Sequence, residues 1–389
     1  MVTELYRHST GHYLSNIAEG LAARGYEVAA ICGQPDYAVR GTTAPRRETL
    51  SGVSVRRCRS TRLRREVLAF RLVNVVTQSL TFLVALFRGV RHGDVVMVVT
   101  NPPSLPFIAA LVCRVRTARL IVLVHDVYPD VLWSTRLLSR SSHFSRLFDW
   151  AQRRTLTSAQ LVLALSYDMQ RRLIERGLAP QAKVAVITNW ADLDLVKATL
   201  RSTEKELVVL YSGNLGRTHG LHDLLAAAQA LEGHPVRFRI AGTGSRRGWL
   251  DRFVESARLS NVAVEEPVPF SDLSDSLSRC DVGFIGMIDE MAGVSAPSRF
   301  YNLLAAGRPV MFVGDASTDI AQIIREFAIG WVIPPDHPRQ LAATLVSVAA
   351  DRAELPEMGA RARSLAEAQY KKDRIMDAYY DMIESLSDI

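Results

Sequence analysis

The chain alternates short apolar segments with amphipathic ones, and this alternation restricts its fold more than any other feature. In the first half, residues 26–32, 94–100, 119–124, 161–166 and 184–187 are apolar and read as strands. Helical spacing of apolar residues marks residues 12–24, 67–90, 142–157 and 167–176. Apolar strands separated by helices predict a parallel sheet that helices cover on both faces.

The alternation starts again after a polar stretch, residues 189–205. Strands are expected at residues 207–211, 237–241, 262–264, 281–285 and 309–313. Helices are expected at residues 221–231, 249–259, 272–278 and 297–306, followed by helices to the end. We expect domains at 1–188 and 189–369, with helix 370–389 able to pack back onto the first.

The predicted fold class is α/β, with two doubly wound Rossmann-like domains facing each other across a cleft. The chain opens on a helix, although such a domain normally begins on its central strand. Either that strand lies upstream or the first domain lacks it.

Composition excludes a disordered or fibrous protein, because 48% of the residues are apolar and 22% are charged. The four cysteines lie far apart without metal-ligand spacing, so we expect no metal and a reduced, cytosolic compartment. The amino terminus lacks the pattern of a secretory signal, and we expect the protein to stay inside the cell.

Positive charge is concentrated in the first half of the chain. Residues 1–195 contain 26 Lys and Arg against 14 Asp and Glu, a net charge of +12, whereas the remainder contains 21 against 26, a net charge of −5. One short segment holds Arg56, Arg57, Arg59, Arg62, Arg64 and Arg65.

An apolar stretch, residues 67–87, follows this basic segment at once. The combination favours an anionic membrane surface as partner and a peripheral position on the inner face of the cell membrane. Arg71, Asn74 and Gln78 interrupt the apolar run, so a spanning helix is not expected. A nucleic acid is a competing partner without a supporting motif, and a solvated loop before a core helix remains an alternative.

The second half carries three segments suited to an anion. A glycine-rich turn, residues 212–220, includes Gly213, Asn214 and Arg217, and Gly242-Thr243-Gly244 follows the next strand. Pro297-Ser298-Arg299 opens an expected helix that Gly307 closes, where free amides and a guanidinium can bind a phosphate. Plain turns and ordinary helix capping are the alternatives.

The order of Tyr211 to Gly216, Ala241 to Gly244, Pro297 to Arg299 and Ala305 to Val310 resembles the retaining glycosyltransferases of family 4, which have the GT-B fold. Residues 189–192 and 125–130 look like the WbuB/WcaI-type branch, which builds bacterial cell-surface polysaccharides. The resemblance covers the chain from about Ser9 onward.

This resemblance implies a hexosyltransferase-type enzyme of class EC 2.4 that uses no cofactor or metal. It would move a sugar, with retention, from a nucleotide-diphosphate sugar held by the second domain to a lipid-linked or polysaccharide acceptor held by the first. No nucleic acid partner is expected. The basic arginines Arg56, Arg57, Arg62, Arg64 and Arg65 would then serve the membrane or the acceptor.

By the same resemblance, His125 contacts the transferred sugar, and Asp126 or Asp130 orients His125 or receives the acceptor proton.

The segment Thr10-Gly11-His12 matches a loop placed against the donor phosphate. Arg217 and Arg299 are the candidates that stabilise the leaving diphosphate. Asp192 and Asp194 superficially match a metal pair, but local hydrogen bonding is the expected role. The assigned donor residues are Gly11, Gly213, Asn214, Arg217, Gly242, Gly244, Glu290, Gly293, Val294, Ser298, Arg299 and Asn302.

The chain also departs from the family pattern. The two glutamates that usually flank the donor correspond to Val294 and Asn302, although Glu290 can replace the first. The basic residue of the glycine-rich turn corresponds to Thr218 or His219, which leaves Arg217 as a substitute. A sugar-nucleotide epimerase or hydrolase on the same fold and a non-catalytic scaffold are therefore the alternative functions.

Overall fold

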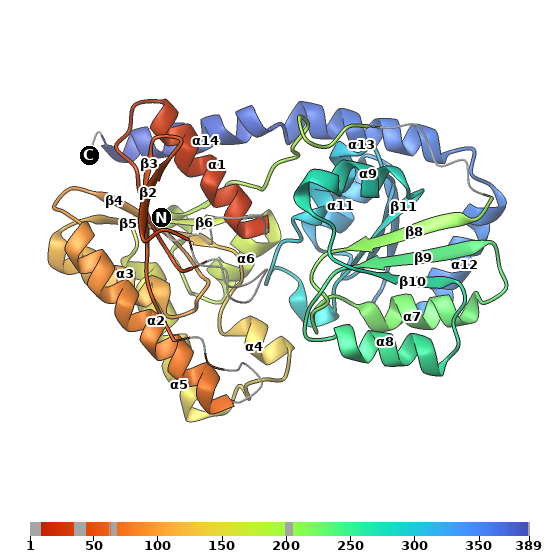
Figure 1. Ribbon diagram of the computed structural model, residues 1–389, viewed down its shortest axis with the longest axis horizontal. Coiled ribbons are helices and arrows are strands. Elements are labelled where there is room, and N and C mark those ends of the chain that lie inside the picture. The colour runs from red at the N-terminus through yellow and green to blue at the C-terminus, as the bar shows by residue number, and fades with distance from the viewer. Residues whose placement is uncertain (1–8, 35–43, 62, 64–67, 199–204, 388–389) are drawn as a thin grey trace. The chain divides into compact units, whose positions relative to one another are not determined.

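The computed structural model describes residues 9–34, 44–61, 63, 68–198 and 205–387. The chain folds into two compact units (Figure 1). Unit 1 contains Met1–Trp133, Leu138–Ile187 and Met376–Ile389, and unit 2 contains Ser134–Leu137 and Thr188–Ile375.

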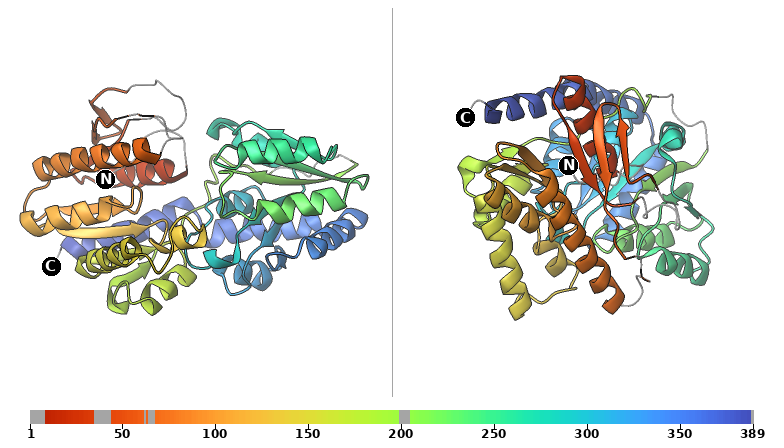
Figure 2. Two further views of the ribbon diagram at one scale, coloured as in Figure 1. Left: turned by 90° about the horizontal axis from the view of Figure 1, so that it is seen from below. Right: turned by 60° about the vertical axis from the view of Figure 1, so that its left-hand side comes forward.

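Unit 1 contains two sheets. Strands β1 (Ala29–Cys32), β3 (Val53–Arg57) and β2 (Arg47–Leu50) form the first in that order, with β1 parallel and β2 antiparallel to β3. The second is parallel, with the order β4 (Val95–Val99), β5 (Arg119–Val124), β6 (Leu161–Ala164) and β7 (Val184–Val186). The right view of Figure 2 shows the first sheet from the front.

The prediction of a single parallel sheet is therefore wrong for unit 1. Among the described residues no strand pairs with both sheets, so the two sheets are not hydrogen-bonded into one. This arrangement fits a doubly wound domain without its central first strand, the feature that the sequence indicated.

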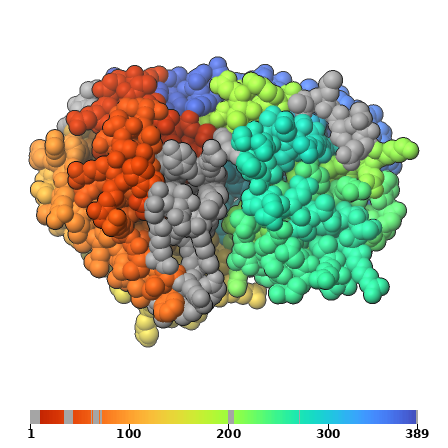
Figure 3. Space-filling model, in the orientation of Figure 1, coloured from red at the N-terminus to blue at the C-terminus, as the bar shows by residue number. Residues whose placement is uncertain are grey.

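The β2–β3 hairpin was not predicted, because its strands are short and carry three arginines. Its two-residue loop, Ser51-Gly52, has φ angles of 48° and 82°. Positive φ at both positions is typical of the type I′ turn, whose twist matches that of the flanking strands. Val53 and Val55 are buried and Ser54 is exposed, so the strand has one apolar face. The hairpin reaches the surface on the face of unit 1 in Figure 3.

The helices of unit 1 are α1 (Ser9–Ala23), α2 (Leu68–Gly89), α3 (Leu105–Arg116), α4 (Asp130–Ser134), α5 (His143–Ser158), α6 (Tyr167–Glu175) and the short η1 (Gln181–Lys183). Four of them, namely α1, α2, α5 and α6, agree with the predicted ones to within a few residues, whereas α3, α4 and η1 were not predicted. The helix α3 follows the Pro102-Pro103 pair. It packs against α2, β4, β5 and α5.

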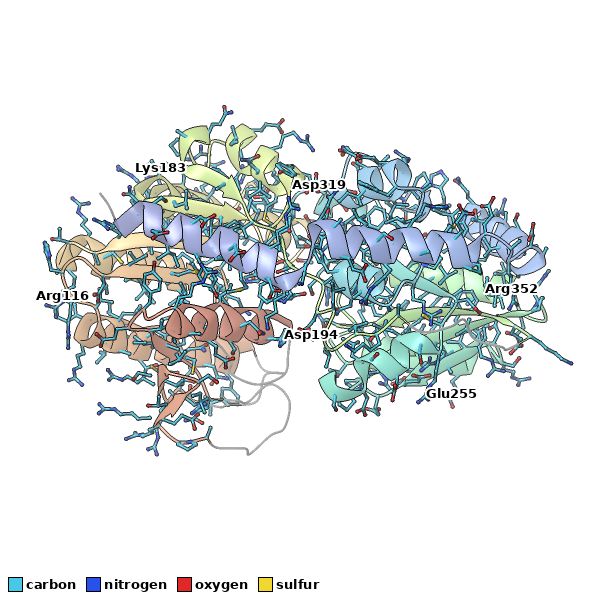
Figure 4. The ribbon with its side chains drawn as sticks, turned by 90° about the horizontal axis from the view of Figure 1, so that it is seen from above. Arg116, Lys183, Asp194, Glu255, Asp319 and Arg352 are labelled. Atoms are coloured by element: carbon cyan, nitrogen blue, oxygen red, sulfur yellow. The ribbon has the colours of Figure 1, made fainter. Side chains whose placement is uncertain are left out.

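Unit 1 also includes most of α14 (Lys372–Ser387), which lies against α1 (Figure 4). The Arg24 guanidinium lies 3.6 Å from the Tyr380 ring centroid and donates to Asp377. The last helix of the chain is therefore part of the first unit's packing.

Unit 2 contains one parallel sheet of six strands. Its order is β10 (Val262–Glu265), β9 (Val236–Ala241), β8 (Leu207–Ser212), β11 (Val282–Gly286), β12 (Val310–Val313) and β13 (Gly330–Ile333). This is the doubly wound order, and its direction reverses between β8 and β11. Only β13 was not predicted, since helices were expected from residue 314 onward.

Helices and 3-10 turns complete unit 2. They are α7 (Leu221–Ala230), α8 (Arg247–Ser256), η2 (Phe270–Asp272), α9 (Leu273–Ser278), η3 (Asp289–Met291), α10 (Arg299–Ala305), α11 (Asp319–Glu326), α12 (Pro338–Ala350) and α13 (Leu355–Gln369). A buried apolar core that includes Tyr211, Phe238 and Phe284 joins the sheet to α7 and α12. The packed core therefore supports the two strands, β8 and β11, that flank the switch point.

Candidate functional site

The glycine-rich turn of unit 2 follows β8 at the switch point of the sheet, as the sequence predicted. The amide of Gly213 donates to the Ala241 carbonyl at 2.9 Å, and that of Leu215 donates to the Thr243 carbonyl at 2.9 Å. The turns after β8 and β9 are thus bonded to each other. In a doubly wound sheet, ligands bind at this edge.

Gly242 and Gly244 allow the two turns to touch. A Cβ atom on Gly242 would lie 1.9 Å from the Gly213 carbonyl oxygen, and one on Gly244 would lie 2.5 Å from that of Leu215. Both residues have φ of 155°, which L side chains rarely adopt. Loop packing therefore explains both glycines, and donor binding by their backbone stays a prediction.

Arg299 is the basic side chain that lies against the glycine-rich turn. It begins α10, its Cζ lies 4.4 Å from the ring centroid of Tyr211, and a Cβ on Gly213 would lie 3.2 Å from that Cζ. Its Nη1 is buried and has no hydrogen-bond partner among the described residues. Because a buried donor without an acceptor is costly, this geometry suits an anion that accepts from Nη1.

His219 adds no charge to this site. Burial, with a further contribution from Arg299, lowers the pKa of its imidazole to about 3. The ring is therefore neutral near pH 7 and can donate one hydrogen bond and accept another. The sequence placed His219 only as a possible match to a basic residue, and the structure removes the basic role.

The start of α10 differs from the prediction in one respect. Pro297 was expected at the first helical position, but α10 begins at Arg299 and has only seven residues. Ser298 precedes it, and its hydroxyl makes no cap. At the other end, Gly307 has φ of 62° and its amide donates to Leu304, which confirms the left-handed cap.

The remaining donor candidates differ in exposure. Arg217 and Asn214 are exposed, and no ion pair of Arg217 is found within the described ranges. Glu290 is exposed in η3, and Asn302 is half-buried one turn after Arg299. Gly293 is buried with φ of 67°. Val294 is 0% exposed, so its side chain cannot contact a donor. The prediction that this side chain binds the donor is therefore wrong.

In unit 1, His125 and Asp126 follow the carboxyl end of β5, as predicted. Their amides donate to the hydroxyl of Thr100 at 3.1 and 3.2 Å, and Thr100 itself follows β4. The hydroxyl thus joins the ends of two neighbouring strands. Thr100 was not predicted, because a single threonine after a strand has no distinguishing sequence signal.

Burial shifts both titratable groups toward their neutral forms. It lowers the pKa of His125 to about 4 and raises that of Asp126 to about 6. The buried Nε2 of His125 has no hydrogen-bond partner within the described part of the chain. A neutral imidazole with a free nitrogen, beside a carboxyl group that titrates near pH 6, has the properties of a catalytic pair.

Asp130 has a structural role, which contradicts its assignment as an alternative proton acceptor. Its side chain is 1% exposed. It accepts from Arg172 at 2.9 and 2.6 Å and from Arg176 at 2.9 Å. A carboxylate held by two guanidinium groups has no free oxygen to receive a proton.

The amino-terminal and linker candidates also change. Gly11 and His12 lie in the first turns of α1, not in a loop, because α1 begins at Ser9. Asp192 accepts from the Leu195 amide at 3.2 Å, which confirms its local role. No group of three possible metal ligands occurs in the described ranges, and all four cysteines are buried and free.

The basic segment is only partly described, since Arg62, Arg64 and Arg65 lie outside the described residues. Arg59 is exposed and Arg56 is half-buried. Arg57 is 4% exposed, forms an ion pair with Glu48 and donates to the Pro45 carbonyl at 2.8 Å, so its assignment to a membrane surface is wrong. No described helix is both long and apolar enough to span a bilayer.

Comparison with known proteins agrees with this architecture. Residues 10–190 match the glycosyl transferase 4-like domain, and residues 194–365 match the glycosyl transferases group 1. The chain is 24% identical over 394 residues to the putative colanic acid biosynthesis glycosyl transferase WcaI of Escherichia coli, covering 96% of this chain and 95% of that one. It is 26% identical over 306 residues to the probable glycosyltransferase WbjE of Pseudomonas aeruginosa, covering 76% of each.

Solved structures share the fold at lower sequence identity. Sucrose-phosphate synthase from Thermosynechococcus elongatus has a TM-score of 0.76 at 16% identity, covering 97% of this chain and 94% of that one. WaaG, a glycosyltransferase involved in lipopolysaccharide biosynthesis, has a TM-score of 0.70 at 15% identity, covering 98% of each. Anabaena HepE, solved with UDP and glucose, has a TM-score of 0.69 at 15% identity, covering 97% and 96%.

Two α/β units with these matches define a glycosyltransferase of the GT-B fold. The chain belongs to family 4 of the glycosyltransferases and is of the WcaI type. The predicted transferase activity in polysaccharide biosynthesis is confirmed, and it is supported over the epimerase, hydrolase and scaffold alternatives.

Proposed function

We propose that the enzyme transfers a sugar, with retention, from a nucleotide-diphosphate sugar to a lipid-linked saccharide. The observation that carries the donor half of this proposal is Arg299. Its guanidinium lies against the turn at the switch point, and its buried Nη1 has no partner among the described residues. The solved HepE structure with UDP-glucose, which shares the fold, is consistent with a donor of this kind.

Arg299 would stabilise the leaving diphosphate. As the bond from the sugar to the diphosphate breaks, negative charge accumulates on the phosphate oxygens, and a fixed cation stabilises that charge without reorganising. The Tyr211 ring holds the guanidinium before the donor binds. The neutral His219 beside it would hydrogen-bond the donor, and no metal takes part in the proposed step.

In unit 1, His125 and Asp126 would act on the acceptor side. The free Nε2 of His125 can bond a sugar hydroxyl. Asp126, with a pKa of about 6, is mostly ionised at pH 7 and can accept a proton from the attacking hydroxyl. Thr100 would be a positioning residue, since it bonds both amides.

A membrane surface is the proposed partner of unit 1. One face of α2 exposes Val73, Val76, Leu80, Val84 and Phe87, which follow each other at helical spacing. The neighbouring helix α3 exposes Phe107, Leu111 and Val115 at four-residue intervals. Apolar faces of this kind on a unit with excess positive charge suit the surface of an anionic bilayer.

The cations at the ends of these helices support that orientation. Arg116, labelled in Figure 4, lies 4.3 Å from the Phe87 ring centroid and donates to the Phe87 carbonyl at 2.7 Å. Arg88 and Arg114 are exposed near it. They would bind headgroup phosphates while the apolar faces contact the acyl boundary.

Donor consumption tests the proposal. The protein is incubated with a panel of nucleotide sugars, with and without a bacterial membrane lipid extract, and free nucleotide is measured. We expect release only when the extract is present. Release without any acceptor would contradict the proposal in favour of a hydrolase or epimerase, and donor binding without turnover on any acceptor would favour a scaffold.

A further inference from the structure

Unit 1 contains a pocket that the proposed transfer does not use. It has a volume of about 420 Å³ and lies between the β2–β3 hairpin and α2. Five arginines line its hairpin side, namely Arg46, Arg47, Arg56, Arg57 and Arg59. Leu80 and Val84 of α2 line the opposite side. The arginines border the pocket mainly with their aliphatic stems, so one wall belongs to cationic residues and the other is apolar; we call the first the cationic wall.

The cationic wall is poorly neutralised. Arg47 and Arg56 are direct neighbours across the antiparallel ladder, and like charges in that position destabilise a hairpin. Glu48 pairs with the buried Arg57. No carboxylate of the described residues lies within ion-pair distance of Arg46, Arg47, Arg56 or Arg59. A hairpin with this arrangement would gain stability from a bound anion.

The apolar wall continues outside the pocket. Leu80 is 57% exposed and Val84 is 47% exposed, and both belong to the exposed face of α2 that includes Val76 and Phe87. A ligand that enters from this face would pass its apolar part along α2 and reach the arginines with its charged end. The pocket chemistry therefore fits an amphiphile with an anionic head.

We propose that this pocket binds a phosphate group that carries an aliphatic chain. The phosphate lies among Arg47, Arg56 and Arg59, which can bond its oxygens in pairs, and the chain lies along Leu80 and Val84. This proposal rests on the proposed function in one respect, because that function supplies the lipid that unit 1 would hold. Binding of the ligand to the pocket can be measured without any sugar transfer.

Calorimetric titration with octyl phosphate below its micelle concentration tests the pocket directly. Octyl phosphate should bind about tenfold more tightly than either inorganic phosphate or octyl glucoside, because only it fits both walls. Equal binding of inorganic phosphate and octyl phosphate would overturn the proposal.

Charge variants identify the cationic wall. Arg56→Gln should weaken octyl phosphate binding about tenfold, while its thermal midpoint stays equal or rises because a repulsive pair is removed. Arg171→Gln, which removes an exposed charge on α6, is the matched control and should change neither quantity. Equal weakening by both variants would contradict a specific site.

A second pair of variants tests the apolar wall. Val84→Asp places a carboxylate in the pocket and should abolish binding of octyl phosphate. Val346→Asp, at an exposed position on α12 of unit 2, is the matched control and should leave binding unchanged. Unchanged binding by Val84→Asp would overturn the proposal. Arg299→Ala should keep octyl phosphate binding even if it loses the donor, so failure of this proposal and of the proposed function can be told apart.

Vesicles distinguish the source of the phosphate. Wild type and Arg56→Gln are compared on phosphatidylcholine vesicles that contain the same fraction of either a polyprenyl phosphate or phosphatidic acid. Dependence on Arg56 with the polyprenyl phosphate alone assigns the pocket to an acceptor lipid, and dependence with both assigns it to bilayer phosphate. Dependence with neither would contradict the proposal.

Discussion

The two units use arginine differently on their sheets. In unit 2, Arg239 of β9 bonds both oxygens of Glu265 on β10 at 2.7 and 2.8 Å, and Arg237 bonds Glu206 at 2.8 Å. In unit 1, Arg47 and Arg56 face each other across β2 and β3 without a carboxylate between them. Paired arginines stabilise the fold, and we propose that the unpaired arginines that line the pocket of unit 1, together with Arg299, bind an external anion.

Arg299 shows the same distinction within unit 2. Its neighbours are the Tyr211 ring and a glycine-rich turn, and no carboxylate of the described residues pairs with it. By contrast, Arg172 and Arg176 of unit 1 are both bonded to the buried Asp130. An arginine-rich sequence therefore says little about binding until its carboxylate partners are known.

The largest expected effect separates Arg299 from the paired Arg239. Arg299→Ala should lower kcat/KM by about 10²–10³-fold, because it removes a cation from the leaving diphosphate, with little change in the thermal midpoint. Arg239→Ala should lower stability by about 1–2 kcal/mol with a nearly normal rate at low temperature. Steady-state kinetics and thermal unfolding measure both. If the two variants lost activity and stability to a similar extent, paired and unpaired arginines could not be assigned different roles.

Asp130→Asn tests the arginines of unit 1 that are paired with a carboxylate. The change removes the buried carboxylate that Arg172 and Arg176 share, while Arg176 keeps its ion pair with Asp149 at 2.7 Å, and should destabilise the protein by about 3 kcal/mol. Urea unfolding followed by circular dichroism measures this loss. A variant of normal stability that has lost its activity would instead return Asp130 to the catalytic role that the sequence suggested.

Asp126→Asn tests the unpaired carboxyl group. Burial raises its pKa to about 6, so the favourable effect of its protonated form on stability is complete below pH 3.8 and is lost as pH rises through 6. The variant should therefore be more stable than wild type by about 3 kcal/mol at pH 8 and nearly equal to it near pH 4. Unfolding at several pH values measures the difference.

The same residue predicts the pH dependence of the rate. If Asp126 accepts the acceptor proton, the wild-type rate falls as pH drops below about 6, and Asp126→Asn loses most of the rate at every pH. The pH profile of kcat/KM is the measurement. A rate that does not change from pH 8 to pH 5 would exclude this role.

The smallest expected effect concerns the hairpin of unit 1. Arg47→Glu replaces a repulsive cross-strand pair with an attractive one, and should stabilise the protein by about 0.2–1 kcal/mol. Arg171→Glu, on the exposed side of α6, changes the net charge by the same amount and serves as the control. A destabilised Arg47→Glu variant would show that the hairpin arginines already have partners in the free protein.

The sequence predicted unit 2 well because most of its strands, β8, β11 and β12 among them, are apolar and its turns contain glycines with positive φ. It predicted unit 1 less well, because the β2–β3 hairpin is short, polar and rich in arginine. Strand β13 was lost for a similar reason, since its four residues begin with a glycine and are only partly buried.

The candidate site shows the same limit. Its glycines, Arg299 and His125 could be found from local patterns, whereas the partners of a side chain depend on tertiary contacts. Asp130 and Arg57 looked available in the sequence, but each is buried in an ion pair. Thr100 and Tyr211 looked ordinary, yet they position the candidate catalytic pair and Arg299.

Binding of inorganic pyrophosphate tests the central claim most directly, because it does not depend on the sugar or the base. We expect isothermal titration to show saturable binding to the wild type, at least about tenfold weaker binding to Arg299→Ala, and no change for Arg252→Ala, an exposed control on α8. Equal affinity of wild type and Arg299→Ala for pyrophosphate would contradict the claim that this guanidinium is reserved for the donor diphosphate.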